Sequence, residues 1–314
     1  MDFLGADGSQ AGVVDKAAPV GTVIFCEACH NEAAANLTSV VFPSGAEVKG
    51  LGDEARCMQC HQGRASTVAV DDVVAKAGVG DDQVSADLSF INIHYYAAAA
   101  TQFGTVAKGG YQYPGKSYDA RFAHVEGFTA CIDCHDPHSL KVKVEACTMC
   151  HQDVKSVEDF KKVRMESSTK DYDGDGDVKE GIYGEIETLQ AMLYQAIQAY
   201  AQEVSKVAIA YNSAAYPYFF VDTNGNGQAD PDEVNFQNRY NAWTPRLLKA
   251  AYNYQTSMKD PGAFVHGGKY IIQLLYDSIE DLNQALSKPV DLSKAHRVDA
   301  GHFDGSSEAI KHVL

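Results

Sequence analysis

Four short motifs carry the chemistry that this sequence suggests. Each is Cys-x-x-Cys followed directly by His, and together they use all eight cysteines of the 314 residues. This is the attachment signature of c-type haem, in which the two thiols bond to the haem and the histidine ligates the iron. The motif residues are Cys26, Cys29 and His30; Cys57, Cys60 and His61; Cys131, Cys134 and His135; and Cys147, Cys150 and His151. The sequence therefore predicts four haem c groups, each with its proximal histidine.

Two other uses of paired cysteines compete with haem attachment. Two Cys-x-x-Cys pairs can form a zinc ribbon, and a single pair can be a disulfide or a redox dithiol. Neither use requires a histidine directly after every pair, and only 11 of the 314 residues are histidine. The pattern favours haem over a zinc and calcium scaffold without haem, which we keep as an alternative.

A haem iron with two histidine ligands also needs a distal histidine. His138 follows the third motif so closely that it cannot reach the far face of its own haem, but it could cap a neighbouring one. His296 and His312 are expected to be solvent-exposed. The distal candidates are His94, His124, His138, His266 and His302. One distal ligand could also come from another copy of the chain in a head-to-tail assembly.

Residues 222–233 fit the twelve-residue loop of an EF-hand calcium site. Gly227 at the sixth position allows the sharp turn, and Glu233 at the twelfth can chelate calcium with both carboxylate oxygens. The predicted ligands are Asp222, Asn224, Asn226, Gln228, Asp230 and Glu233. An acidic turn without metal is the alternative.

A second acidic loop begins at Asp171 and repeats the first half of this pattern. Its twelfth position is Ile182, so Glu180 or Glu185 would have to supply the missing carboxylate. The predicted ligands are Asp171, Asp173, Asp175 and Asp177. Both loops border a predicted long helix, and we expect one or two structural Ca2+ ions rather than a regulatory switch.

The motifs lie close together between Cys26 and His151, in a segment with glycine-containing turns. This segment is too short to build a conventional protein core around four haems. We therefore expect the porphyrins to form its core, with only short helices at the motifs. The predicted first domain is a haem-cored, loop-rich tetrahaem unit of residues 1–165.

Helical periodicity appears after residue 165. Apolar residues recur at three- and four-residue steps in runs that include Ile182, Thr244-Pro245 and Ile271. Thr before Pro is a favourable helix start, because Thr caps the helix and Pro occupies its first position. The predicted fold is thus mostly α and loop, with residues 166–314 as a second domain that holds a small helical bundle over 166–290 and the EF-hand-like loops.

Charge and composition limit the partners. The formal net charge of −16 argues against nucleic acid and against an anionic membrane surface, and it suits a basic partner. No stretch approaches the roughly 18 consecutive apolar residues of a transmembrane segment. Haem attachment takes place outside the cytoplasm, so the protein is expected to be extracytoplasmic. Residues 1–25 lack a signal-peptide pattern, and we expect the numbering to start on a mature chain.

The four motifs and the string Cys-Ile-Asp-Cys-His-Asp-Pro-His at residues 131–138 resemble the multihaem c-type cytochromes of metal-reducing and other anaerobic microbes. Within that group, residues 26–151 resemble the tetrahaem extracellular cytochromes that polymerise into filaments, or nanowires. The resemblance implies stacked low-spin haems with two histidine ligands each, one distal histidine taken from the next subunit, and a location outside the cell or on its surface rather than in the periplasm. Implied partners are redox proteins or extracellular electron acceptors.

Residues 252–275 are also similar to the C-terminal helices of the multihaem nitrite reductase and hydroxylamine oxidoreductase group. That similarity suggests an alternative, an oxidoreductase for a small nitrogen or sulfur oxyanion. Such an enzyme needs an iron with an exchangeable site. The chain has no Cys-x-x-Cys-Lys motif and has enough histidines for all four irons. We therefore predict an electron carrier rather than an enzyme, with a soluble periplasmic shuttle as a further alternative.

Overall fold

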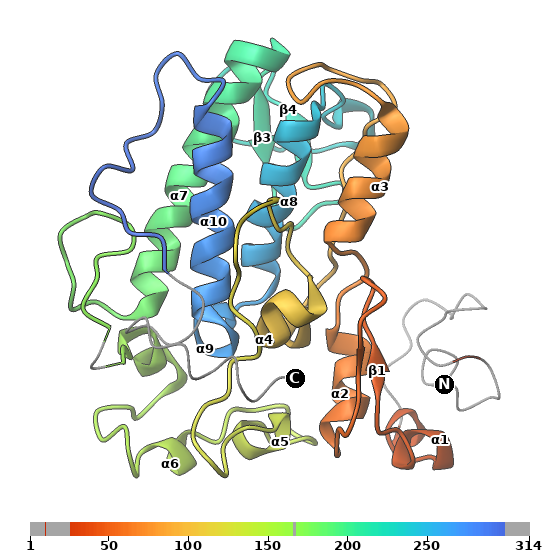
Figure 1. Ribbon diagram of the computed structural model, residues 1–314, viewed down its shortest axis with the longest axis vertical. Helices are drawn as coiled ribbons and strands as arrows, with labels where there is room; N and C mark the ends of the chain where they lie inside the picture. The colour runs from red at the N-terminus through yellow and green to blue at the C-terminus, as the bar shows by residue number, and fades with distance from the viewer. Residues whose placement is uncertain (1–9, 11–25, 166–167, 299–314) are drawn as a thin grey trace.

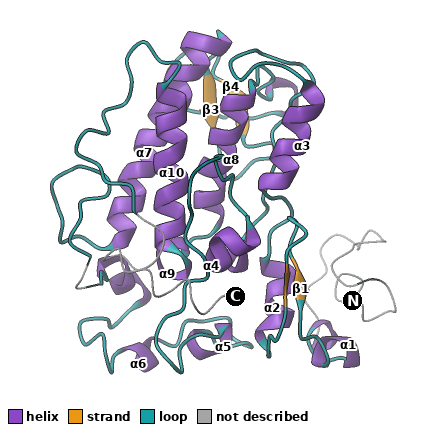
Figure 2. Ribbon diagram, in the orientation of Figure 1, coloured by secondary structure: helices purple, strands orange, loops and turns teal. Residues whose placement is uncertain are grey.

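A computed structural model describes residue 10 and residues 26–165 and 168–298. Helices and loops make up most of this part of the chain, as predicted (Figures 1 and 2). The helical elements are η2 (Cys26–Ala28), α1 (Glu32–Ala35), α2 (Glu54–His61), α3 (Thr67–Ala77), α4 (Ala98–Ala107), α5 (Cys131–Cys134), α6 (Val144–Cys147), η3 (Val157–Lys162), α7 (Ile182–Tyr200), η4 (Ala201–Ser205), η5 (Phe236–Asn238), α8 (Pro245–Lys259), α9 (Ala263–His266) and α10 (Gly268–Asn283). The strands form two antiparallel hairpins, β1 (Val40–Val41) with β2 (Glu47–Val48) and β3 (Ile209–Tyr211) with β4 (Phe219–Val221).

The long helices α7, α8 and α10 stand side by side and form the predicted bundle (Figure 1). The apolar stripe of α7 is buried, as its spacing requires, and includes Leu189 and Leu193. Helix α8 begins as predicted, because the Thr244 hydroxyl accepts a hydrogen bond from the Leu247 amide at 3.1 Å and Pro245 occupies the first turn. The three periodic runs are confirmed as helices.

A second hydrophobic core lies before the bundle in the sequence. It is built mainly from residues 40–111 and includes Val40, Phe42, Met58 and Phe103, and Tyr252 of α8 contributes to it. The expectation that the haem segment has no protein core of its own is therefore wrong for this part. Its α4 contains three consecutive alanines, small side chains that let the neighbouring backbone approach closely.

Contacts between the second core and the bundle cross the predicted domain boundary. The Tyr111 amide donates to the Asn253 side chain at 2.6 Å, and the Gly110 amide donates to the Tyr270 hydroxyl at 3.1 Å. A Cβ on Gly110 would lie 2.2 Å from the Leu274 side chain, which would have to move to make room for it. The division after residue 165 stays a prediction.

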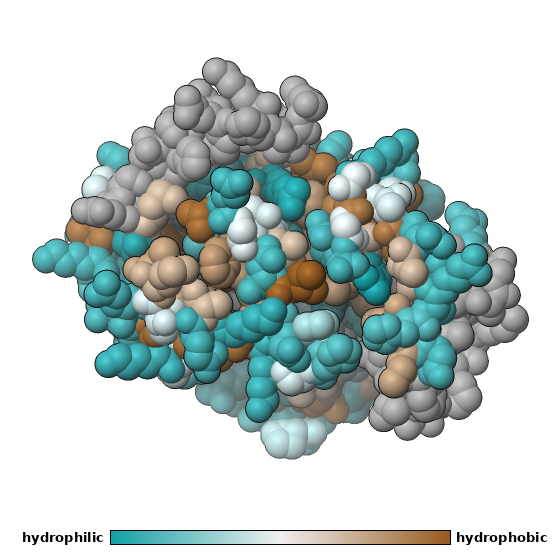
Figure 3. All heavy atoms as spheres, turned by 90° about the horizontal axis from the view of Figure 1, so that it is seen from below, coloured by the Kyte–Doolittle hydropathy of each residue, from teal (hydrophilic) through white to brown (hydrophobic). Residues whose placement is uncertain are grey.

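The haem-attachment motifs gather at one end of the molecule, the lower end of Figure 1, around α2, α5 and α6. Neither α5 nor α6 buries any residue among the protein atoms. Viewed from below in Figure 3, this end mixes apolar with hydrophilic side chains. None of the described helices has the length and apolar character needed to cross a membrane.

Candidate haem-binding site

Each Cys-x-x-Cys-His motif sits on a short helical turn. A helix places residues three and four apart on the same face, so both thiols and the following histidine can address one porphyrin. In three motifs the histidine amide donates to the carbonyl of the first cysteine, which closes this turn. These bonds join His30 to Cys26 at 2.7 Å, His135 to Cys131 at 2.9 Å and His151 to Cys147 at 2.9 Å. The second motif lies wholly within α2.

The attachment cysteines of successive motifs are neighbours in space. Three pairs of thiols from successive motifs lie close enough to interact electrostatically. These pairs are Cys29 with Cys60, Cys57 with Cys131, and Cys134 with Cys147. The four attachment sites thus follow one another in the order of the sequence.

Three of the four proximal histidines face a second histidine ring. The centroid distances are 6.1 Å for His30 with His138, 6.1 Å for His151 with His124, and 6.3 Å for His135 with His266. An imidazole nitrogen lies about 2 Å from a first-row metal and about 1 Å from its own ring centre, so two rings on opposite sides of one ion are about 6 Å apart. The residues present therefore fit haems with two histidine ligands.

The second motif has a different environment. The Nδ1 of His61 is 2.7 Å from the Tyr96 carbonyl, which fixes the tautomer that leaves Nε2 available for iron. His94 has a positive φ of 82° and packs against the ring of Tyr95. Partial burial, followed by the charges of Arg64 and Lys259, lowers the pKa of His94 and favours the neutral form that a metal requires.

No ring contact joins His61 to another histidine in the described part of the chain. Its distal partner stays a prediction, with His94 as a candidate and with His302 outside the described residues. His312 also lies outside them, and His296 is exposed.

The sequence is similar to two curated cytochromes of Geobacter sulfurreducens. The C-type polyheme cytochrome OmcB is 28% identical over 288 residues, which is 80% of this chain and 34% of OmcB. The C-type polyheme cytochrome OmcC is 27% identical over 288 residues, or 80% of this chain and 33% of OmcC. The chain is homologous to multihaem c-type cytochromes. It spans about a third of the length of these relatives.

Neither a family model nor a solved structure matches the chain. The candidate haem ligands of the chain therefore follow from its own residues and their geometry.

One of the three histidine pairs has a buried acidic neighbour that the sequence analysis did not predict. Both carboxylate oxygens of Asp260 lie 2.9 Å from Nδ1 of His266, and Asp260 is only 3% exposed. Burial disfavours the charged form of both groups. The attraction and hydrogen bond between them nevertheless hold the pKa of Asp260 below its ordinary value and the pKa of His266 above its own. A carboxylate bonded to Nδ1 orients the ring and leaves Nε2 for a metal. The sequence feature that could have indicated this pair is the Asp-Pro-Gly turn at residues 260–262, which brings Asp260 close to His266.

The turn after the third motif is held by its own side chains. Asp136 accepts hydrogen bonds from the amides of His138 at 3.1 Å and Ser139 at 2.6 Å, and these bonds hold the pKa of Asp136 below its usual range. This turn carries His138 away from His135 and toward the ring of His30. The local sequence Asp-Pro-His thereby links two attachment sites.

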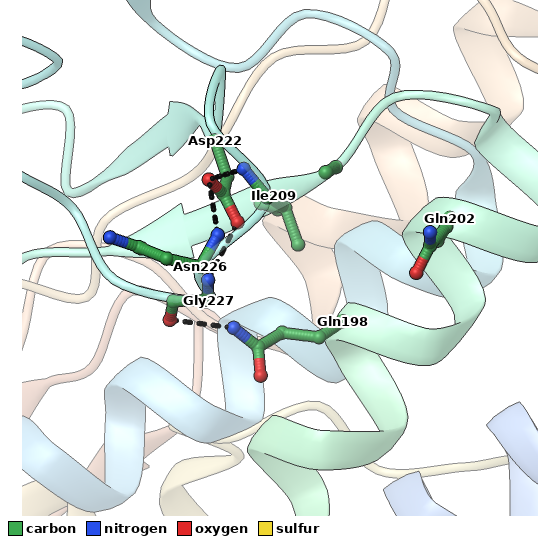
Figure 4. A pocket seen from close by; sticks show the side chains of 8 residues that line it. Gln198, Gln202, Ile209, Asp222, Asn226 and Gly227 are labelled. Carbon is green, nitrogen blue, oxygen red and sulfur yellow. Dashed lines mark hydrogen bonds between the residues drawn. The ribbon is translucent and has the colours of Figure 1, made fainter.

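The loop at residues 222–233 folds as a tight turn beside α7 (Figure 4). Asp222 accepts hydrogen bonds from the backbone amides of Gly225, Asn226 and Gly227. The side-chain amides of Asn224 and Asn226 donate hydrogen bonds to Asp230. Gln228 is exposed, and Glu233 is bonded to Thr223. The carboxylates of this loop are not among the three-carboxylate clusters found in the described residues. Calcium binding here stays a prediction.

Proposed function

We propose that the chain transfers electrons through four covalently attached c-type haems, at least three of them with two histidine ligands. The three histidine ring pairs, with centroids 6.1–6.3 Å apart, carry this proposal. Each pair combines a motif histidine with a histidine outside that motif. Homology to polyhaem cytochromes supports the same function.

Bound haem supplies reversible one-electron chemistry. The paired histidines would ligate the haem iron, their hydrogen-bond partners would fix the imidazole tautomers, and the positions of the motifs would set the order of the attachment sites. Because neighbouring thiols link the sites in sequence order, we propose a single row from the first motif to the fourth. The acidic surroundings favour the oxidised state, so negative potentials are expected, and a titration with all four potentials above zero would contradict this.

We also propose an extracytoplasmic location, at the cell surface or outside the cell, with redox proteins or extracellular acceptors as partners. A head-to-tail homo-oligomer would supply His61 with a distal ligand from the next copy. Electron microscopy of the haem-loaded protein tests this step. Regular fibres with a one-subunit repeat support it, and discrete particles under the same conditions count against it.

The proposed ligands can be tested by substitution of one distal histidine. His138→Ala should leave the haem content at four per chain, measured as pyridine haemochrome, and should convert one low-spin haem to high spin in the electron paramagnetic resonance spectrum. His296→Ala is the control, because this exposed ring bonds the Asp171 carbonyl instead. A haem content below four, or an unchanged spectrum in His138→Ala, would contradict the assignment.

A further inference from the structure

Two overlapping clusters of carboxylates occupy the loop that begins at Asp171. In each cluster the candidate ligand oxygens lie within 4.8 Å of one another, and Asp173 belongs to both. The clusters are Asp171, Asp173 and Glu185, and Asp173, Asp175 and Glu180. Such crowding of negative groups is unfavourable without a compensating cation.

Two oxygens in these clusters are buried and without a hydrogen-bond donor among the described residues. Asp173 is 3% exposed, and its Oδ2 has no partner among the described residues; the same holds for Oε1 of Glu180. A buried carboxylate oxygen without a donor or a positive charge is costly. Buried carboxylate oxygens without a hydrogen-bond donor are typical of metal ligands.

The backbone of the loop has the form needed to surround a cation. Gly174 and Gly176 have φ values of 86° and 101°, which favour glycine, and their amides donate to the two oxygens of Asp171 at 2.5 and 2.9 Å. Gly176 is the sixth residue of the loop, where calcium loops make their sharp turn.

Glu185 of α7 lies beside the loop, whose twelfth position is Ile182 rather than a carboxylate. Glu185 is fully buried, and its Oε2 accepts hydrogen bonds from the amides of Tyr172 at 2.8 Å and Asp173 at 3.0 Å. Its Oε1 is paired with Arg164. Arg164 thus compensates one negative charge, and the remaining carboxylates keep an excess of negative charge around Asp173.

We propose that this cluster binds one Ca2+ ion, through carboxylates of Asp171, Asp173, Asp175 and Glu180, with Glu185 closing the loop from α7. Oxygen ligands in a flexible loop suit calcium better than the smaller magnesium, which demands a near-octahedral set. Ile182, at the standard twelfth position, is buried in the bundle core and takes no part.

The position of the site gives the ion a structural role. Arg164 donates to the carbonyls of Ser168, Lys170 and Glu180, and so holds both ends of the loop. The Asp171 carbonyl is 2.8 Å from the His296 ring. Gly181, at the start of α7, lies so close to the Lys161 carbonyl of η3 that a Cβ would be 1.9 Å from it. Bound calcium would stabilise the packing of the segment after the fourth haem motif against the helical bundle.

The test is calorimetric titration of the haem-loaded chain with Ca2+ after treatment with a chelator. Asp173→Asn should remove one equivalent of bound calcium, or weaken that site at least about tenfold, because calcium affinity follows the ligand charge. Asp153→Asn is the matched control. It is exposed, it lies outside the loop, and it belongs to neither carboxylate cluster.

Glu180→Gln provides a second variant in case Asp173→Asn does not fold, and it should also weaken the site. Calcium stoichiometry and affinity equal to the unaltered chain in both variants would overturn the proposal. The haem content and haem spectrum, measured on the same samples, test the proposed electron transfer separately. Failure of one proposal therefore leaves the other standing.

Discussion

Asp260 is a single charge placed directly behind a proposed haem ligand. Its carboxylate accepts a hydrogen bond from Nδ1 of His266, whereas the equivalent partner of His61 is a neutral carbonyl, that of Tyr96. A carboxylate partner makes the imidazole a stronger donor to the metal and stabilises the oxidised iron. We therefore expect the haem of the third motif to differ in potential from that of the second.

Replacement of Asp260 by Asn tests this difference. The amide can still accept the Nδ1 hydrogen bond but carries no charge, so one haem should shift to a more positive potential while the haem content stays at four. A spectroelectrochemical titration measures the shift. Asp153→Asn, an exposed carboxylate near the fourth motif, is the control. Identical titration curves for Asp260→Asn and the unaltered chain would show that this carboxylate does not act on a haem.

Residue patterns could predict the candidate haem residues that local sequence places. The attachment cysteines are predicted from their motif, and His138 is predicted from its position directly after the third motif, from which it can reach only a neighbouring attachment site. The pairing of His135 with His266 could not be assigned, because it depends on how α9 packs beside the attachment end. Likewise, Glu185 enters the acidic loop only because α7 begins next to it.

At the scale of elements, periodic spacing predicted α7, α8 and α10 but not α3 or α4. Helix α4 is short and contains a glycine with non-helical angles, so its sequence lacks a clear stripe. Gly104 has φ 46° and ψ −122°, and a Cβ there would lie 2.2 Å from the Asp119 carbonyl oxygen. This close approach lets residues 119–122 run alongside α4, where the Thr105 amide bonds the same carbonyl at 2.8 Å.

Substitution of Gly104 by Ala should therefore destabilise the fold by more than about 2 kcal/mol, since strain and a collision with rigid backbone add together. Gly78→Ala is the matched control. It also has a positive φ, 60°, but faces open space, so only about 1 kcal/mol is expected from its left-handed conformation. Urea unfolding followed by circular dichroism measures both. Equal losses would mean that the contact with Asp119 relaxes without cost.

At the scale of the whole molecule, the haem motifs occupy one end and two protein cores fill the rest (Figure 1). The cores meet through α8, because Tyr252 faces the second core while Leu247, Leu248 and Ala251 face the bundle. Composition and periodicity could predict a bundle, but they could not predict this shared helix. The end of the molecule that carries the haem motifs is thus joined to the rest by continuous packing rather than by a flexible linker.

The formal charge of −16 should control how this scaffold meets its redox partners. Long-range attraction accelerates encounters between opposite charges, and salt screens it over about 10 Å at 0.1 M. Reduction of a small basic electron-transfer protein should therefore slow as ionic strength rises. Reduction of an acidic protein of similar size should accelerate over the same range, because salt then screens repulsion. Stopped-flow absorbance of the haem bands measures both rates, and the acidic protein serves as the control. If both rates changed in the same direction, net charge would not govern the encounter, and a local patch at the haem end would have to do so.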